Sequence, residues 1–319
     1  MSYLHRSYRE KNQTISIDAK SISIDAKSIS IDTKYTKLKN IFIFFLISLK
    51  FYASKMRTLT ELNMRSPYDR LLAAASDGSI TTCRNIMAMG IDVDSKVNYG
   101  HRTALNAACH NGHIEVAKLL LEYGADVDST DDCLSRPLHS AVCARAGLQY
   151  RIDLCKLLLD HGANVNAMDT SGRTPLKIAA TNVDFKVCEL LLSRGACIYI
   201  RDSWGLSALH YACSNQMDAV DVCRLLLDYG ADINQTCHLN GQTPLFYASM
   251  KGNKKLCELL LDRGADMTIK NRWGESCLEI ATRKNEYEVV KILNCYMERD
   301  EIVSRRRDLL SLMITEDYE

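Results

Sequence analysis

The sequence of 319 residues lacks the short motifs by which common enzymes and metal proteins are recognised. Although there are 13 cysteines, no two of them are spaced as C-x-x-C, which is the strongest zinc-binding signal. There is also no G-x-G-x-x-G, G-x-x-x-x-G-K-[ST], H-E-x-x-H or G-x-S-x-G segment to bind phosphate, hold zinc or present a nucleophile. We therefore expect a protein that is not an enzyme and that has no catalytic residue, cofactor or metal ion.

The sequence also lacks an apolar run that is long enough to cross a membrane as a helix. The run 41–49 has nine residues and is followed by Lys50, whereas a spanning helix needs about 20. A secretory signal would begin closer to the N-terminus than residue 41. We do not expect the membrane as a partner, and a membrane-tethered protein that uses residues 41–53 is kept as an alternative.

Residues 1–65 form a segment of low complexity that we expect to be disordered. It contains ISIDAKS twice and then ISIDTKY, with apolar residues at every second position rather than at heptad spacing. Of the 40 Lys and Arg, 10 lie in residues 1–55, with 4 of the 39 Asp and Glu, which leaves 30 basic and 35 acidic residues elsewhere. A mildly acidic body does not attract nucleic acid. Met56 or Met64 could be the start of the functional protein.

The rest of the chain repeats itself. A G-A-[DNC] step begins at Gly124, Gly162, Gly195, Gly230 and Gly264, at intervals of 38, 33, 35 and 34 residues by subtraction. A period of this length is typical of proteins in which one supersecondary unit is stacked on the next. The repeat therefore determines the architecture before any single residue is interpreted.

Each unit has the same order of signals. A turn leads into T-P-L or a related triplet, where Thr or Ser can cap a helix and Pro suits its first position. Small residues follow, then a second helix with an L-L-L run, and then a glycine that can end the helix in the left-handed conformation. The triplets begin at Thr103, Arg136, Thr174, Ser207, Thr243 and Ser276.

These signals resemble the ankyrin repeat, whose pattern is TPLHxAAxxGHxEVVxLLLxxGADVN. The segments ALNAACHNGHIEVAKLLLEYGADVD (104–128) and PLKIAATNVDFKVCELLLSRGACIY (175–199) follow it closely. The resemblance implies an all-α ankyrin-repeat solenoid of stacked helix-turn-helix units with β-turn or hairpin tips. It covers residues 66–298, with five full repeats and an atypical capping unit at each end, 67–94 and 273–298.

Three segments depart from the pattern. The third unit has five extra residues around 145–150, and the unit 208–230 has two around 216–219, which we place in the turns between the helices. The charged tail 299–319 includes three consecutive arginines, 305–307, and we expect it to form a helix on the last repeat. Three arginines are also a weak nuclear-localisation signal.

The cysteines and histidines are interpreted as structural residues. Five cysteines share one position, just before the L-L-L run, where they would be buried and too far apart to form disulfides; they are Cys83, Cys155, Cys188, Cys223 and Cys257. A reducing compartment is therefore expected, with the cytoplasm as the location and the nucleus as the alternative. We expect His110, His113, His139 and His210 to bond to backbone at the turns.

The positions that the repeat leaves free indicate a binding protein. Aromatic residues and arginine dominate interface energetics, and they occur here at turn tips. The candidate partner-binding residues are Tyr99, Arg102, His110, Asn111, Arg136, Arg173, Thr181, Asn182, Trp204, Leu206, Ser214, Asn215, His238, Met250, Lys251 and Trp273. For the two tryptophans, an exposed anchor and an indole stacked on the next turn are both open.

The leading hypothesis is a monomeric, non-catalytic adaptor or scaffold that docks a protein or peptide on the concave face and the tips of the array. A substrate-recognition subunit of a ubiquitin ligase is a second hypothesis, motivated by the C-terminal tail.

Overall fold

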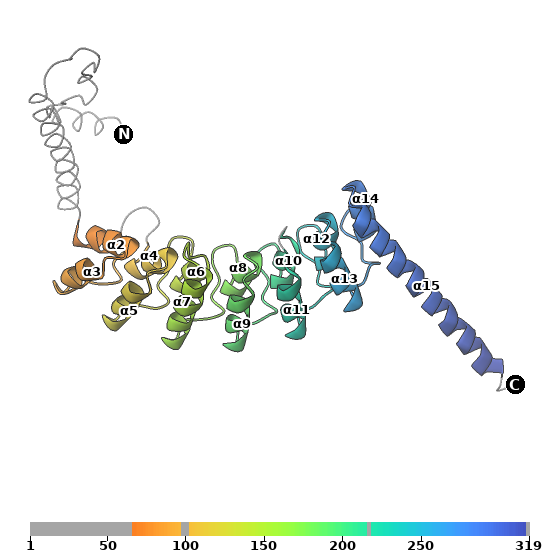
Figure 1. Cartoon of the computed structure of the whole chain (residues 1–319), viewed down its shortest axis with the longest axis horizontal. Helices are drawn as coiled ribbons and strands as arrows, with labels where there is room; N and C mark the ends of the chain where they lie inside the picture. Colours follow the sequence, from red (N-terminus) through yellow and green to blue (C-terminus); the bar gives the residue numbers. More distant parts are fainter. Residues whose placement is uncertain (1–65, 97–101, 216–217, 317–319) are drawn as a thin grey trace, which may run out of the picture. The chain divides into compact units, whose positions relative to one another are not determined.

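The computed structural model describes residues 66–96, 102–215 and 218–316 (Figure 1). The N-terminal segment 1–65, with its apolar run, and the candidate site residue Tyr99 lie outside the described residues. Within these ranges every regular element is an α-helix, and the helices form seven consecutive pairs. The expected all-α ankyrin-repeat solenoid is confirmed.

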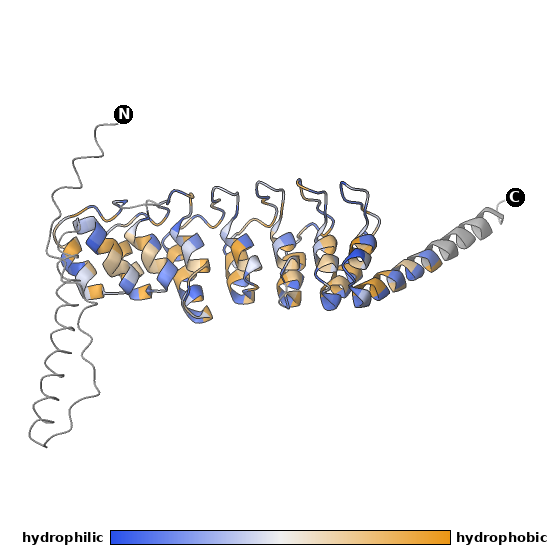
Figure 2. Ribbon diagram, turned by 90° about the horizontal axis from the view of Figure 1, so that it is seen from above, coloured by the Kyte–Doolittle hydropathy of each residue, from blue (hydrophilic) through white to orange (hydrophobic). Residues whose placement is uncertain are grey.

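The first helices of the pairs stack in one row and the second helices in another, because each helix contacts its counterpart in the next pair. The first helices are α2 (Pro67–Asp77), α4 (Ala104–Asn111), α6 (Pro137–Val142), α8 (Pro175–Thr181), α10 (Ala208–Cys213), α12 (Pro244–Met250) and α14 (Cys277–Arg283). The second helices are α3 (Ile80–Met87), α5 (Ile114–Glu122), α7 (Leu148–Asp160), α9 (Phe185–Ser193), α11 (Val220–Asp228), α13 (Lys254–Asp262) and α15 (Tyr287–Glu316). The loops between pairs lie along one side of the helices (Figure 2).

Helices α4, α6, α8, α10, α12 and α14 begin at the residue after the predicted cap. Thr103, Thr174 and Ser276 accept a hydrogen bond from the amide three residues later, at 3.3, 3.4 and 3.2 Å. Thr243 does not cap α12, because the Phe246 amide donates instead to the Thr243 carbonyl at 3.0 Å. Within the described residues, the buried Thr243 hydroxyl has no hydrogen-bond partner.

Five of the second helices end at a glycine in the left-handed conformation, with φ of 85° to 87°. These glycines are Gly124, Gly162, Gly195, Gly230 and Gly264. The loop that follows each is tied to the neighbouring loop by a carboxylate or an amide. Asp94 accepts from the Asp126 amide at 2.9 Å, and Asn234 accepts from the Asp266 amide at 2.8 Å. The acidic residues of these loops thus bond to backbone, as the sequence predicted.

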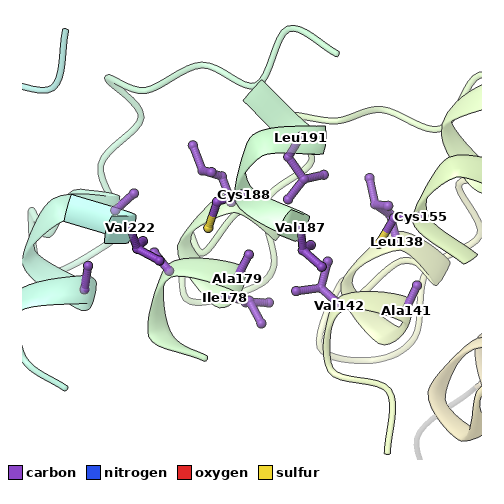
Figure 3. Packing of buried hydrophobic residues seen from close by; sticks show 14 of the residues in the cluster. Leu138, Ala141, Val142, Cys155, Ile178, Ala179, Val187, Cys188, Leu191 and Val222 are labelled. Atoms are coloured by element: carbon purple, nitrogen blue, oxygen red, sulfur yellow. The ribbon is translucent and has the colours of Figure 1, made fainter. Parts of the chain in front are cut away.

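The core is continuous along the array. The middle leucines of the L-L-L runs are completely buried; they are Leu120, Leu158, Leu191, Leu226 and Leu260. Figure 3 shows buried side chains of α8 and α9, among them Ala179 and Val187, in one cluster with side chains of the neighbouring pairs, such as Val142 of α6 and Val222 of α11. Because each unit buries its apolar face on its neighbours, the stack is required for folding.

The extra residues of the third unit form helix in part, so the prediction of a longer turn was wrong for them. Helix α7 begins at Leu148 and has 13 residues, against 9 in α5. Its added first turn leaves Leu148 and Tyr150 exposed. Of the second insertion, residues 216–217 lie outside the described residues.

Helix α15 runs past the last repeat. Its first turns contact α13 and α14 and bury Val289, Ile292 and Leu293. The same helix then continues to Glu316, through position 299, at which the sequence analysis divided the array from the tail. No helix within the described residues is both long enough and apolar enough to cross a membrane.

Candidate protein-binding surface

Four of the described turn tips are each closed by one polar side chain. Asp169 Oδ1 accepts hydrogen bonds from the amides of Ser171 and Arg173, both at 2.9 Å, and the Asp169 amide donates to the Arg173 carbonyl at 3.0 Å. The tips at Asp131, Asp202 and Asn271 are closed in the same way. These polar residues therefore serve the turn and are not available to a partner.

The tips are also bonded to one another. The Thr170 amide donates to the Cys133 carbonyl at 2.9 Å, and the Ser203 amide donates to the Ser171 carbonyl at 3.1 Å. The series continues from His238 to Trp204 at 2.8 Å and from Arg272 to Asn240 at 2.9 Å. This ladder holds consecutive tips side by side, so that their outer side chains form one continuous surface.

Large apolar side chains are exposed on the last three tips. The exposed fraction is 43% for Trp204, 64% for Leu239 and 69% for Trp273. The next tip lies against the tip of Trp204, because the His238 amide donates to the Trp204 carbonyl, whereas within the described residues no further tip follows that of Trp273. Both indoles are therefore accessible from outside the array. We call Trp204, Leu239 and Trp273 the tip row.

Sequence reasoning missed Leu239 and named only its neighbour His238, which is also exposed. This tip has one residue more than the others: the Cys237 amide donates to the Gln242 carbonyl, while the Asp202 amide donates to the Leu206 carbonyl. Counting from the first residue of the tip would have placed Leu239 beside Trp204 and Trp273. Leu206 is half-buried beneath its tip.

The three predicted arginines of the earlier tips are paired with aspartates. Their ion-pair distances are 3.7 Å for Arg102 with Asp131, 4.0 Å for Arg136 with Asp128, and 2.8 Å for Arg173 with Asp169. Arg102 and Arg173 keep about half of their side chains exposed, while Arg136 is largely covered. Their charges are thus partly neutralised within the array.

The predicted residues at the ends of the first helices mostly bond to backbone. Asn111 donates to the Ala107 carbonyl at 3.0 Å, and Thr181 donates to the Lys177 carbonyl at 2.8 Å. Asn182 donates to the Val142 carbonyl at 3.3 Å, and Asn215 to the Thr181 carbonyl, so these two amides bridge adjacent repeats. Four predicted residues remain. The His110 carbonyl accepts a hydrogen bond from the Arg145 amide, and the Ser214 hydroxyl donates to the Tyr211 carbonyl. Met250 is half-buried against the core, and Lys251 is exposed.

Two histidines hold the first helices to the next tips. His139 Nε2 faces the Arg173 carbonyl at 3.1 Å, and His210 Nε2 faces the Gln242 carbonyl at 3.2 Å. A carbonyl only accepts, so Nε2 carries the proton, and Nδ1 accepts from an amide of the helix cap. Burial lowers the pKa of His139 below its ordinary value and the pKa of His210 to about 4. Both imidazoles are structural, as predicted.

Lys177 stands where His139 and His210 stand in their repeats, and it is only 1% exposed. Its Nζ donates to the Gly172 carbonyl at 3.0 Å. Burial lowers the pKa of Lys177 to about 8, against the opposing effect of Asp202 and Asp169. This lysine is therefore a buried charge that supports a tip and does not reach the surface.

The five cysteines of the shared position are all buried, as predicted. Burial raises the pKa of each thiol for which a shift is resolved, to about 11 for Cys83 and to about 12 for Cys155 and Cys257. The Sγ atoms of Cys213 and Cys223 lie 3.8 Å apart. Within the described residues, no group of three His, Cys, Asp or Glu side chains is arranged to hold a metal ion.

The family model for ankyrin repeats matches residues 71–169, 138–237 and 233–302. This match covers most of the chain and agrees with the repeated helix pairs, the capped first helices and the bonded tips. The protein is a member of the ankyrin repeat family. Ankyrin repeats generally act as protein–protein interaction modules without catalytic activity of their own.

Several curated proteins are similar over parts of the array. A probable E3 ubiquitin-protein ligase of rice, XBOS33, is 33% identical over 96 residues, which is 29% of this chain and 18% of that protein. Dauer abnormal formation protein 25 of Caenorhabditis elegans is 31% identical over 93 residues, which is 29% of this chain and 23% of that protein. The aligned stretches span less than a quarter of these relatives, so their names describe proteins with much more sequence than is shared.

Proposed function

We propose that this protein is a non-catalytic adaptor or scaffold that binds a protein or peptide through the tip row and the adjoining faces of the first helices. We also propose that the protein is a monomer, that it does not bind nucleic acid, and that it is located in the cytoplasm, with the nucleus as the alternative. The mildly acidic composition after residue 55 supports the exclusion of nucleic acid.

The exposure of the tip row carries this proposal. Most predicted polar residues bond to the array itself, but Trp204 and Trp273 are exposed on bonded tips that hold them in place. Aromatic side chains on a rigid support bind with little loss of conformational entropy. Trp is also a residue type that contributes strongly to binding hot spots.

Affinity purification with a Trp204→Ala, Trp273→Ala double variant tests the proposal. Each hot-spot aromatic contributes about 2 kcal/mol or more, so partner capture is expected to fall at least about tenfold. The matched control is Tyr123→Ala, Tyr229→Ala, which removes two aromatics that are each 47% exposed at the ends of α5 and α11. Unchanged capture by a folded tryptophan variant would reject the proposal.

A substrate-recognition subunit of a ubiquitin ligase is the second candidate. The similarity to the rice protein favours it, although the aligned stretch is 18% of that protein. This role requires that a part of the chain outside the tip row contacts the ligase machinery. It predicts co-purification with cullin-type components that is lost when residues 299–319 are deleted, and a deletion that leaves every partner in place would count against it.

The membrane-tethered alternative depends on residues 41–53, which lie outside the described residues. It predicts that the full-length chain sediments with membranes and that deletion of these residues releases it. Recovery of the full-length chain wholly in the soluble fraction would reject this alternative.

A further inference from the structure

The tip row is bordered by cations that form no ion pair within the described part of the array. Arg272 lies in the last tip next to Trp273, and Lys270 precedes it by two residues. Lys251 and Lys284 follow α12 and α14, one short helix length, roughly 10 Å, from the tips. All four residues are exposed, and none forms an ion pair among the described side chains.

The carboxylates of the same region are already bound to the protein. Glu275 pairs with Arg283 at 3.1 Å and accepts from the Asn271 amide group at 3.0 Å. Asp202 is buried and accepts from two amides of its tip and from the Tyr211 hydroxyl at 2.7 Å.

Two further carboxylates lie in this region. Glu286 lies against Gly252, which follows Lys251, and Glu279 accepts a hydrogen bond from the Ser276 amide at 2.5 Å. That backbone hydrogen bond lowers the pKa of Glu279, with a smaller contribution from Lys270. The outer surface of the last tips therefore has a positive balance, although the chain after residue 55 has more acidic than basic residues.

From this arrangement we infer that the tip row binds an acidic segment of a partner protein that also carries large apolar side chains. The apolar side chains pack on Trp204, Leu239 and Trp273, and the carboxylates lie near Arg272 and Lys270. Complementary charge accelerates encounter and excludes basic segments, while the apolar contacts supply most of the affinity. This inference rests on the proposed function and specifies the chemistry of its partner.

Selection of a random peptide library displayed on phage, with the full chain as bait, tests the inference. The selected peptides are expected to be enriched in both acidic and large apolar residues. Both tryptophans of the chain belong to the tip row, so a selected peptide that binds there should change the intrinsic tryptophan emission. Its affinity should decrease as salt is raised, because the charged groups are exposed.

The decisive variant is Lys270→Glu, Arg272→Glu, which reverses the charge but leaves the tip row intact. It is expected to bind a selected acidic peptide about tenfold more weakly, which corresponds to about 1.4 kcal/mol. The control is Lys118→Glu, Lys156→Glu, which makes the same change of charge at exposed positions of α5 and α7. Selected peptides without acidic enrichment, no selection above the Trp204→Ala, Trp273→Ala variant, or an equal loss in the control would each overturn the inference.

The two proposals fail in different ways. If capture of the natural partner is lost in the tryptophan variant but retained in the charge-reversal variant, the binding function stands and the acidic-segment inference is wrong. If capture is unchanged in the tryptophan variant, the proposed function itself is wrong.

Discussion

One repeat position shows how the same fold accommodates different side chains. The third residue of the first helix is Asn106, His139, Lys177, His210 or Phe246 in successive units, and all five are buried. The histidines bond to the next tip, the lysine bonds to its own tip, and the phenylalanine is apolar. The position therefore accepts side chains of different chemical types, but burial there lowers the pKa of His139, Lys177 and His210.

Replacing Lys177 by Met is expected to change how stability depends on pH. The folded-state pKa of Lys177 is about 8, below the ordinary value of 10.5 for lysine, because the side chain is buried. The unfolded chain thus binds more protons between these values, and wild-type stability rises with pH there. Relative to the variant, wild type should gain up to about 1.4 kcal/mol per pH unit in this window. Urea unfolding from pH 7 upward measures the gain, with the exposed Lys118→Met as control; parallel curves for wild type and Lys177→Met would contradict it.

His210→Phe, which copies the residue type of Phe246, is expected to remove an acid-sensitive contribution. The pKa of His210 is lowered to about 4 in the folded protein from an ordinary value of 6.5. The unfolded chain therefore binds more protons below pH 6.5, and wild type loses stability as the pH falls toward 4. The comparison is the slope of unfolding free energy against pH, since the variant also loses a hydrogen bond. If both proteins have the same slope, the conclusion that His210 is neutral in the folded protein is wrong.

At the scale of elements, the path of the chain between repeats depends on the residue at which each second helix ends. The glycines after the second helices have φ near 85°, which L side chains rarely adopt. A Cβ added at Gly162 would meet nothing within 4 Å, so the requirement for glycine there comes from the backbone and not from crowding. The next loop takes its direction from this residue.

Gly162→Ala is therefore expected to lower the free energy of unfolding by about 1–2 kcal/mol through backbone strain alone. Gly162→Asn should be less harmful, because Asn adopts the left-handed conformation more readily. Gly147→Ala is a matched control, since Gly147 has φ of −60° and an added Cβ would lie 4.0 Å from Tyr150. Equal losses at both glycines, measured by urea unfolding, would show that strain is not the cause.

At the scale of the whole array, each helix pair is stabilised by its neighbours, so the apolar surface of a terminal pair must be buried in another way. At the C-terminal end the cover is the beginning of α15, which buries Val289 and Leu293 completely and Ile292 almost completely. Further along the same helix, Met297 and Ile302 are exposed. The stabilising part of this helix is thus its first few turns.

Truncation after Glu286 is expected to destabilise the array by on the order of 5 kcal/mol, because it removes three buried apolar side chains and exposes the core surface that they cover. Truncation after Arg299 keeps those three side chains and is expected to leave the unfolding midpoint close to that of wild type. Thermal unfolding of the two truncated chains against the full chain measures the difference. A large loss in the longer chain as well would place essential contacts beyond residue 299.

The repeat period, the starts of the first helices and their glycine-ended partners were predictable because they depend on residues within one unit. A capping Thr acts on an amide three residues away, and a left-handed glycine acts on its own backbone. The exceptions have local causes too. The Phe246 amide donates to the Thr243 carbonyl instead of the Thr243 hydroxyl, and the extra residues before Arg151 extend helix α7 at its start.

The sequence did not predict in the same way which side chains are available to a partner. Asn182 and Asn215 were variable in sequence and therefore seemed available, but each donates to a carbonyl in the preceding repeat. Arg173 was named for its type, yet its tip aspartate holds it at 2.8 Å. Leu239 was passed over because one additional residue shifted its tip.

The sequence alone therefore determined the architecture of this protein: the unit, its period, its core and the absence of recognised catalytic motifs. Only the tertiary structure decided which side chains remain for a partner. The physical reason is that a polar atom is available only if no neighbour satisfies it, and in a stacked array those neighbours come from other repeats, more than 30 residues away. Exposure and hydrogen bonding across repeats are the observations from which we propose the tip row and its cations as the binding surface.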